Sequence, residues 1–179
     1  MHDGIGGPRH SVAANGGRVW SQEISRSSKG EFSVSAQRRG EETWSGSLFE
    51  GSGTVSLSSS GAADALPVTW ASRSETSGGK TSPEELIAAA HAGCYAMELS
   101  NQLAQQDHAP EKLEVTAVSS FAKVEGGFRM TRMDLEVNGT VPGIDGPAFE
   151  EAAQAAKDGC PVSNALKNNV EITLKASLA

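Results

Sequence analysis

The stretch that most constrains the fold is a run of small and apolar residues that begins with a complete set of helix-start signals. Ser82 stands directly before Pro83, and Glu85 follows three residues after Ser82, which is the pattern of an N-cap with a capping box. Most positions from Leu86 to Met97 are Ala, Leu, Ile, Met or Gly. Because such residues occupy more than one face, we predict a helix that runs to about Gln106 and is buried nearly all round.

Short strand-like segments precede this helix, and longer ones follow it. The predicted strands are Trp44–Glu50, Thr54–Ser58, Val68–Ser72, Leu113–Ala122, Phe128–Val137 and Val170–Leu178. The last of them alternates apolar and polar residues with a period of two, which is typical of a half-buried strand. Between Met130 and Met133 the apolar positions change parity, and this predicts a β-bulge.

Two shorter helices complete the predicted order of elements. One begins at Asp145-Gly146-Pro147 and reaches about Lys157, and the other begins after Cys160-Pro161. Grouped strands, a buried helix, grouped strands, helices and a final strand indicate an α+β fold. We expect antiparallel sheets wrapped around the central helix, and not a doubly wound nucleotide-binding fold.

Length and charge indicate one folded domain with an extension. The chain has 179 residues and a formal net charge of −7. Residues 1–40 are rich in Gly, Ser and Arg and carry six basic against three acidic side chains, so we predict a flexible N-terminal extension. Residues 41–179 should form the domain, with nine basic and 19 acidic groups. This acidic balance argues against nucleic acid as the main partner.

Cysteine usage and hydropathy bear on where the protein works. Two cysteines are too few for a disulfide-built secreted scaffold, and the N-terminus lacks the apolar run of a signal peptide. Polar residues such as His91 and Glu98 interrupt the most apolar stretch, well short of a membrane span. We therefore expect a soluble protein of the reducing cytoplasm, with no membrane partner.

Patterns for metal and phosphate sites are incomplete. The four histidines form no short-spaced pair with a cysteine, so no metal is predicted. Gly79-Lys80-Thr81 resembles the end of a phosphate-binding loop, but the first glycine of such a loop would fall at Ser74. We do not predict a nucleotide site.

The two cysteines, Cys94 and Cys160, indicate thiol chemistry. An ordinary cysteine is only about 3% thiolate at neutral pH, and making it mostly thiolate needs roughly 2.7 kcal/mol. Cys94 lies 12 residues beyond Ser82, too far for the helix dipole, so it needs a nearby cation, for which Arg73 is the candidate. Cys160 stands at an expected helix N-terminus, which would itself lower its pKa. Spacing alone leaves open which thiol reacts first.

His91 suggests a second possible role for Cys94, as the nucleophile of a hydrolase. It lies three residues before Cys94, on the same helical face, as in a Cys-His hydrolase dyad. Such a dyad also needs an orienting acid and an oxyanion hole, and the sequence offers no clear candidates. A histidine on an apolar helix is more often a packed core residue, which is the reading we favour.

Several motifs, in order and from about Thr43 to the C-terminus, resemble the OsmC/Ohr family of osmotically inducible and organic hydroperoxide resistance proteins. They are the segment from Thr81 to Cys94 (TSPEELIAAAHAGC), Val141–Asp145 (VPGID), Gly159–Ser163 (GCPVS) and Val170–Leu174 (VEITL). Cys-Pro-Val-Ser, together with Ser72-Arg73-Ser74-Glu75, is more similar to the OsmC branch than to the Ohr branch.

The resemblance implies an intertwined homodimer with two active sites at its interface, and a cysteine-based peroxidase. By this resemblance Cys94 is the peroxidatic cysteine and Cys160 the resolving one. Arg73 would stabilise the Cys94 thiolate and polarise the peroxide, and Glu84 would hold the guanidinium. No bound cofactor is expected. An external dithiol would regenerate the enzyme, a lipoylated protein in Ohr relatives.

The expected substrates are organic hydroperoxides, with hydrogen peroxide reduced less well. The Leu, Met and Ala residues around Cys94 suggest an apolar mouth, which suits an organic substituent. A redox-sensing or binding module of the same fold, without turnover, is the alternative. It would consume peroxide only once per protein thiol, even when a dithiol reductant is present.

Overall fold

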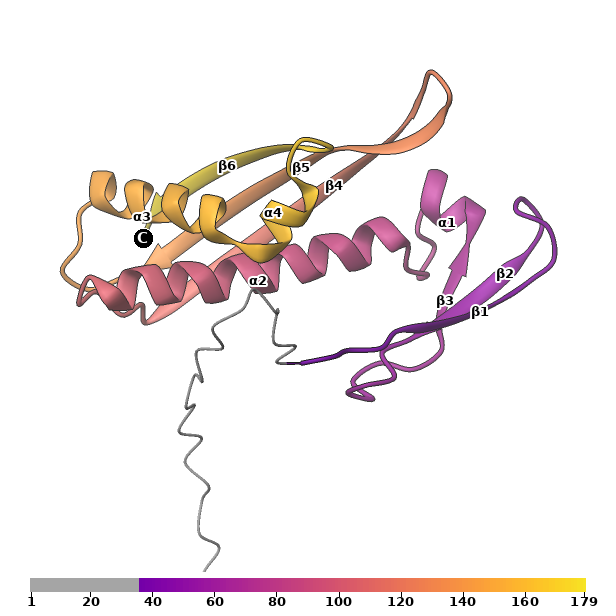
Figure 1. Cartoon of the computed structure of the whole chain (residues 1–179), viewed down its shortest axis with the longest axis horizontal. Coiled ribbons are helices and arrows are strands. Elements are labelled where there is room, and N and C mark those ends of the chain that lie inside the picture. Colours follow the sequence, from indigo (N-terminus) through magenta and orange to yellow (C-terminus); the bar gives the residue numbers. More distant parts are fainter. Residues whose placement is uncertain (1–35) are drawn as a thin grey trace, which may run out of the picture. The chain divides into compact units, whose positions relative to one another are not determined.

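The computed structural model describes residues 36–179 (Figure 1). Arg38–Ala179 forms one compact unit, which is described below. The predicted N-terminal extension, residues 1–40, lies almost wholly outside the described residues. Its flexibility, and the domain boundary at residue 41, therefore stay predictions.

A three-stranded antiparallel sheet opens the described chain. Its strands are β1 (Glu41–Ser45), β2 (Ser52–Ser56) and β3 (Leu66–Thr69), paired in the order β1-β2-β3. The turn between β1 and β2 requires glycine at position 51, because a Cβ there would lie 2.3 Å from the Ser47 carbonyl oxygen. The second predicted strand, Thr54–Ser58, is confirmed with bounds two residues earlier, whereas the first, Trp44–Glu50, is wrong beyond Ser45, where the chain turns toward β2.

The third predicted strand, Val68–Ser72, is wrong in its second half, where the chain forms the short helix α1 (Trp70–Ser74). The Thr69 hydroxyl accepts a hydrogen bond from the Ser72 amide at 3.1 Å, and the Ser72 hydroxyl accepts one from the Thr69 amide at 3.0 Å. This reciprocal capping box favours a helical turn over continued strand pairing.

The long helix α2 (Pro83–Gln105) begins and ends close to where the sequence predicts. The Ser82 hydroxyl accepts a hydrogen bond from the Glu85 amide at 3.2 Å, which confirms the N-cap. The Glu85 carboxylate accepts a hydrogen bond from the Thr81 hydroxyl at 2.7 Å and not from the Ser82 amide, so the predicted capping box is not closed. Within residues 36–179, neither α2 nor any shorter helix has the length and apolarity needed to cross a membrane.

A second sheet has the order β4-β5-β6, built from β4 (Lys112–Val124), β5 (Gly127–Thr140) and β6 (Glu171–Leu178). β4 and β5 form an antiparallel hairpin, whose register shifts because Ser120 pairs with Arg132 and Phe121 with Met130. Thr131 is the extra residue, so the predicted bulge between Met130 and Met133 is confirmed.

β6 corrects the expectation of purely antiparallel sheets, because it pairs with β5 in parallel. Between these strands the chain forms α3 (Gly146–Gly159) and α4 (Pro161–Leu166). A parallel pair needs such a crossover, since the chain must return to the start of the neighbouring strand.

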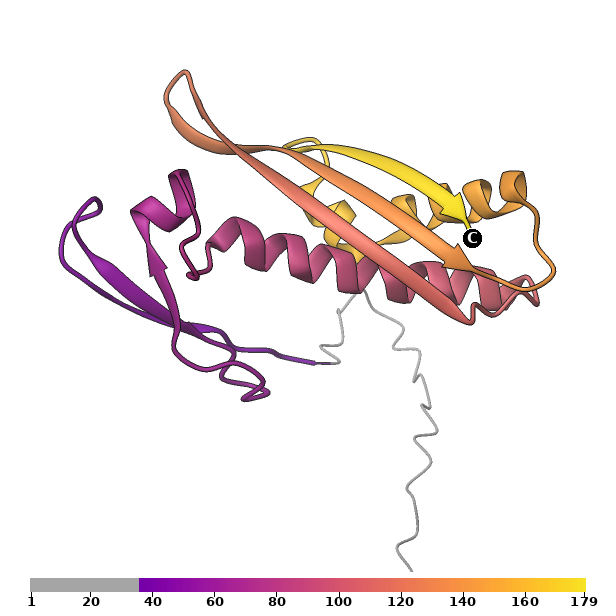
Figure 2. The ribbon, with the colours of Figure 1, turned by 180° about the vertical axis from the view of Figure 1, so that it is seen from behind.

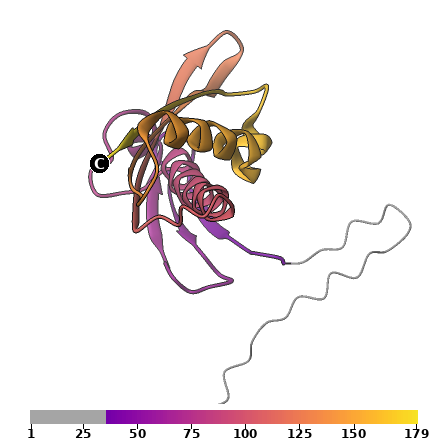
Figure 3. The same ribbon diagram turned by 90° about the vertical axis from the view of Figure 1, so that its left-hand side faces the viewer.

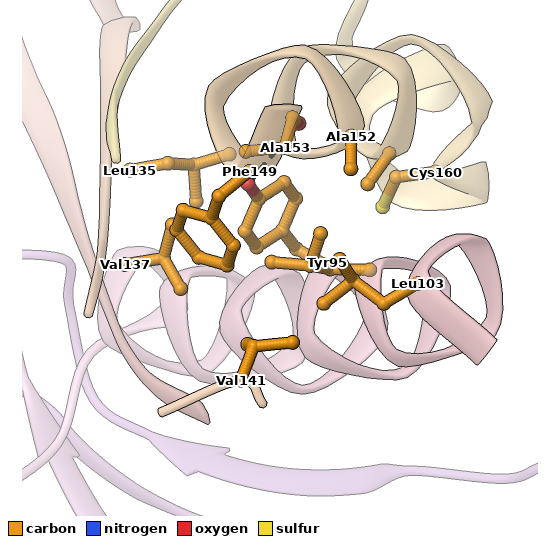
Figure 4. Packing of buried hydrophobic residues seen from close by; sticks show 11 residues of the cluster. Tyr95, Leu103, Leu135, Val137, Val141, Phe149, Ala152, Ala153 and Cys160 are labelled. Atoms are coloured by element: carbon orange, nitrogen blue, oxygen red, sulfur yellow. Dashed lines mark hydrogen bonds between the residues drawn. The ribbon is translucent and has the colours of Figure 1, made fainter. Parts of the chain in front are cut away.

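The core lies between this second sheet and the helices on one of its faces. Figure 2 shows β4, β5 and β6 in front of the helices, and Figure 3, which looks nearly along α2, shows α3 next to it. The buried cluster comes from α2, β5, the chain just after β5, α3 and the start of α4 (Figure 4). Its members are Tyr95, Leu99, Leu103, Leu135, Val137, Val141, Phe149, Ala152, Ala153, Ala156 and Cys160.

One face of α2 departs from the prediction of a helix buried nearly all round. Ala89, Ala90, Gly93 and Met97 are exposed in the single chain, and Met97 keeps 70% of its accessible surface. The opposite face, which carries Tyr95, is fully buried. The α+β fold class is confirmed, with two sheets and a helix packed against them, but α2 retains an uncovered apolar face.

Candidate active site

The two cysteines, far apart in sequence, are neighbours in the fold. Cys94 lies in the middle of α2 and is partly exposed, whereas Cys160 is the N-cap of α4 and is completely buried. In Figure 4 the Cys160 side chain points toward α2. Both thiols are free, and the Cys160 side chain is close enough to act on Cys94 through a hydrogen bond.

The surroundings of Cys94 favour its neutral thiol. Burial is the largest effect and raises the pKa of Cys94, while a hydrogen bond from the Val162 backbone amide lowers it. The hydrogen bond with Cys160, the charge of Cys160 and the charge of Glu98 raise the pKa further. None of the groups in residues 36–179 that shift this pKa is a cation, so activation must come from outside this set.

Arg73 and Glu84 form the second predicted pair. Arg73 Nη2 donates to Glu84 Oε1 at 2.7 Å, and Arg73 Nε donates to Oε1 at 3.0 Å and to Oε2 at 3.1 Å. Glu84 is only 8% exposed, and it lies in the first turn of α2. Such a forked, charge-assisted contact fixes the orientation of the guanidinium.

Aromatic rings complete the surroundings of Arg73. Its guanidinium carbon lies 4.4 Å from the centre of the Phe121 ring and 5.9 Å from the Trp70 ring. A cavity of about 460 Å³ opens beside it, lined by residues that include Trp44, Leu48 and Trp70. The guanidinium is thus oriented by a carboxylate and bordered by an apolar hollow.

Within one chain the cysteine pair and the Arg73–Glu84 pair are separate. Glu84 and Cys94 are ten residues apart on the continuous helix α2, which corresponds to a rise of about 15 Å. The fold therefore brings the four predicted site residues together as two pairs and not as one cluster.

His91 belongs to neither pair. It is fully buried, and its Nε2 atom lies 2.8 Å from the Ser163 hydroxyl oxygen. Burial lowers the pKa of His91, and its Nδ1 atom has no hydrogen-bond partner among the described residues. Its contact with Ser163 gives no support to a Cys94–His91 hydrolase dyad.

Three residues near the thiols escaped the sequence reasoning. Glu98 is four residues after Cys94 and thus on the same helical face, a spacing that could have identified it. Val162 and Ser163 stand inside the Cys-Pro-Val-Ser motif, but their contacts with α2 depend on how α4 packs. Local sequence patterns do not contain that information.

Comparison with known proteins places the chain in a family. The model of the family described as OsmC-like protein matches residues 76–175. The chain belongs to the OsmC-like protein family. Peroxiredoxin OsmC of Escherichia coli is 41% identical over 145 residues, which cover 81% of this chain and 99% of that protein. These two matches confirm the resemblance to the OsmC/Ohr family that the motifs of this OsmC-like chain indicate.

Further relatives of this OsmC-like chain belong to the Ohr group. An organic hydroperoxide resistance protein of Xanthomonas axonopodis is 30% identical over 98 residues, or 54% of this chain and 67% of that protein. The crystal structure of the organic hydroperoxide resistance protein OhrB of Bacillus subtilis superposes with a TM-score of 0.62 at 26% identity, covering 77% of this chain and 97% of that one. The α+β architecture is that of OsmC and Ohr proteins.

Proposed function

We propose that this protein is a cysteine-based peroxidase that reduces organic hydroperoxides to alcohols, and hydrogen peroxide less well. Relatives named peroxiredoxin and organic hydroperoxide resistance protein support a peroxidase-type role. The observation that carries the proposal is that a partly exposed thiol, Cys94, packs against the buried cluster that contains a fully buried thiol, Cys160.

In this proposal Cys94 reacts first. A hydroperoxide can approach the partly exposed Cys94, whereas Cys160 has no exposed surface. The Cys94 thiolate attacks the distal peroxide oxygen, the O–O bond breaks, and the alkoxide takes a proton and leaves as the alcohol. Cys94 is then a sulfenic acid next to a buried thiol.

The second step joins the two sulfurs. Cys160 attacks the Cys94 sulfur, the S–O bond breaks, and the thiol proton leaves with the hydroxyl as water. The product is an intramolecular Cys94–Cys160 disulfide, and no bound cofactor takes part. An external dithiol, for which we propose a lipoylated protein, then returns both thiols and carries away the oxidising equivalents.

The cation that activates Cys94 is proposed to be Arg73 of a second subunit. Arg73 and Cys94 of one chain are kept apart by about 15 Å of helix between Glu84 and Cys94. The uncovered apolar face of α2, which includes Gly93 and Met97, is a surface that a second copy would bury. A homodimer could therefore set the Arg73–Glu84 pair of each chain against the thiols of the other.

The cavity beside Arg73 supports the choice of organic hydroperoxides. Trp44, Leu48 and Trp70 line it, so an apolar substituent would be buried there while the peroxide group stays near the guanidinium. Hydrogen peroxide has no substituent to bury, so it should bind more weakly.

Steady-state turnover tests the proposal. The protein is mixed with cumene hydroperoxide and dihydrolipoamide, and peroxide loss is followed for many equivalents of protein. We expect sustained consumption by the wild type, no turnover by Cys94→Ser, and one rapid equivalent consumed by Cys160→Ser before turnover slows. Full activity in Cys94→Ser together with none in Cys160→Ser would reverse the roles of the two cysteines.

The same measurement separates the enzyme from a redox sensor. A sensor of this fold would consume about one equivalent of peroxide per Cys94 and then stop, whatever dithiol is present. The sequence and the fold are compatible with both an enzyme and a sensor, so the number of peroxide equivalents consumed per protein decides between them. Comparing dihydrolipoamide with monothiols and other dithiols identifies the class of reductant.

A further inference from the structure

The contacts between α2 and α4 follow a simple antiparallel register. His91 of α2 lies against Ser163 of α4. Three residues after His91, Cys94 packs against the buried cluster that contains Cys160, which is three residues before Ser163. Residues three apart on a helix share a face, so the two contacts are successive rungs of one helix–helix interface. The His91–Ser163 rung stands one turn away from the reacting sulfurs.

This rung is made of polar groups where apolar ones would pack more easily. His91 has no exposed surface and Ser163 is 5% exposed, while His91 Nδ1 has no partner among the described residues. A buried polar pair that leaves one atom unsatisfied is less favourable than a well-packed apolar pair of similar shape. The polar pair constrains the position of α4 on α2. A 2.8 Å hydrogen bond fixes the distance and angle between His91 and Ser163, whereas apolar contacts would let the two helices slide past each other.

The position of α4 needs such a constraint. The helix has only six residues, Pro161–Leu166, and its N-cap Cys160 makes no capping hydrogen bond through its side chain. The Asn164 side chain donates to the carbonyl oxygens of Asp158, at the end of α3, and of Cys160, so these bonds tie α4 to the preceding chain and do not reach α2. The His91–Ser163 bond does join the two helices, about one turn away from the hydrogen bond of the Val162 amide to Cys94.

We infer that His91 and Ser163 form a positioning pair that holds Cys160 in register with Cys94 for closure of the disulfide. Disulfide geometry is specific, with a sulfur–sulfur bond of about 2.05 Å, so a small slide of α4 along α2 removes the alignment. The pair acts on the resolving step through the position of Cys160, and touches neither peroxide nor the reacting sulfurs. Its place in a catalytic cycle rests on the proposed function, but its effect on disulfide closure does not.

The primary test is the equilibrium of the reduced protein with oxidised dithiothreitol, which forms the Cys94–Cys160 disulfide without any peroxide. Ser163→Ala should lower the equilibrium constant for closure about tenfold, the equivalent of one hydrogen bond. Ser163→Thr keeps the hydroxyl and should restore closure to near the wild-type value. An unchanged constant in Ser163→Ala would overturn the inference.

The double variant His91→Phe/Ser163→Ala separates positioning from stability. It replaces the polar rung with an apolar one, leaves no polar group unpaired there, and should be more stable to urea than Ser163→Ala or His91→Phe alone. We nevertheless expect it to close the disulfide as poorly as Ser163→Ala. If closure recovered along with stability, the pair would serve packing only and the inference would be wrong.

Single-turnover mixing with cumene hydroperoxide adds the catalytic readout. In Ser163→Ala the first phase, loss of peroxide, should match the wild type, and the second phase, loss of the Cys160 thiol, should slow about tenfold. The sulfenic acid should then accumulate as a dimedone adduct. A wild type that consumes no peroxide would refute the proposed function, while the dithiothreitol equilibrium would still decide the role of the pair.

Discussion

At the scale of single residues, the charges around the Cys94 sulfur decide how much of it is thiolate. Within a single chain, burial and the nearby Glu98 raise the pKa of Cys94, and the hydrogen bond from the Val162 amide opposes them. Arg73 is already oriented by Glu84 and by the face of Phe121. Within one chain, Arg73 and Cys94 are kept apart by about 15 Å of helix between Glu84 and Cys94, so we propose that the cation comes from a second subunit.

Removing that cation should slow the first chemical step. An opposite charge close by lowers the pKa of an acid by about 1–3 units, so Arg73→Ala should reduce the thiolate fraction at neutral pH by at most about 10- to 1000-fold. The rate of reaction of Cys94 with iodoacetamide against pH reports its pKa, and peroxide consumption should fall in parallel. The matched control is Arg129→Ala. Arg129 lies on β5 and donates a hydrogen bond to the side chain of Asn169. An unchanged pKa in Arg73→Ala would remove Arg73 from the mechanism.

Buried His91 should make stability depend on pH. Burial lowers the pKa of His91 below its ordinary value of 6.5. As pH falls through 6.5, the unfolded chain binds a proton that the folded chain resists, so the free energy of unfolding decreases, by at most about 1.4 kcal/mol per pH unit. Urea denaturation at pH 7 and pH 5.5 measures the loss, which should be smaller in His91→Phe/Ser163→Ala. An equal loss in both proteins would contradict this assignment.

At the scale of elements, a glycine at position 139 allows β5 and α3 to pack closely against each other. A Cβ built on Gly139 would lie 2.6 Å from Cζ of Phe149, which is completely buried. The α3 helix would have to move to accept it.

Gly139→Ala should therefore destabilise the protein by about 1–3 kcal/mol, as overpacked cores do. Gly146→Ala is the control, because a Cβ at Gly146, the first residue of α3, meets nothing within 4 Å. Urea midpoints of the two variants give the comparison. A Gly139→Ala variant as stable as Gly146→Ala would mean that α3 packs more loosely on β5 than described.

Some elements of the fold can be predicted from neighbouring residues in the sequence, and others cannot. The start of α2 follows from Ser82 and Pro83, and the bulge at Thr131 follows from the change of apolar parity, because both depend on neighbouring residues. The helical turn after Thr69 escaped prediction because a reciprocal hydroxyl cap outweighed a strand-like pattern. The parallel pairing of β6 escaped because it depends on which distant strand is adjacent.

The residues of the candidate site could be predicted from the sequence, but their arrangement in space could not. Cys94, Cys160, Arg73 and Glu84 could be named from motifs and from the resemblance to a family. Their separation into two pairs could not be read from those motifs, because it follows from the length of α2 and from the packing of α4. The roles assigned to the four residues remain predictions.

At the scale of the whole molecule, the proposed site needs two chains, and mixing variants tests this. Subunits with Arg73→Ala keep both thiols, and subunits with Cys94→Ser keep the Arg73–Glu84 pair. The Cys94→Ser homodimer should be inactive and the Arg73→Ala homodimer strongly impaired, whereas random exchange of subunits should recover about a quarter of wild-type activity through one complete site per mixed dimer. Recovery is measured as steady-state loss of cumene hydroperoxide after exchange. A mixture as inactive as its components would place the complete site within one chain.

The most direct test of the central claim is to treat the reduced protein with one equivalent of cumene hydroperoxide and map its disulfides by mass spectrometry under non-reducing conditions. The account predicts one alcohol released for each disulfide formed, with the peptides containing Cys94 and Cys160 of the same chain joined to each other. Peroxide left unconsumed, or consumed while these two peptides stay unlinked, would contradict it.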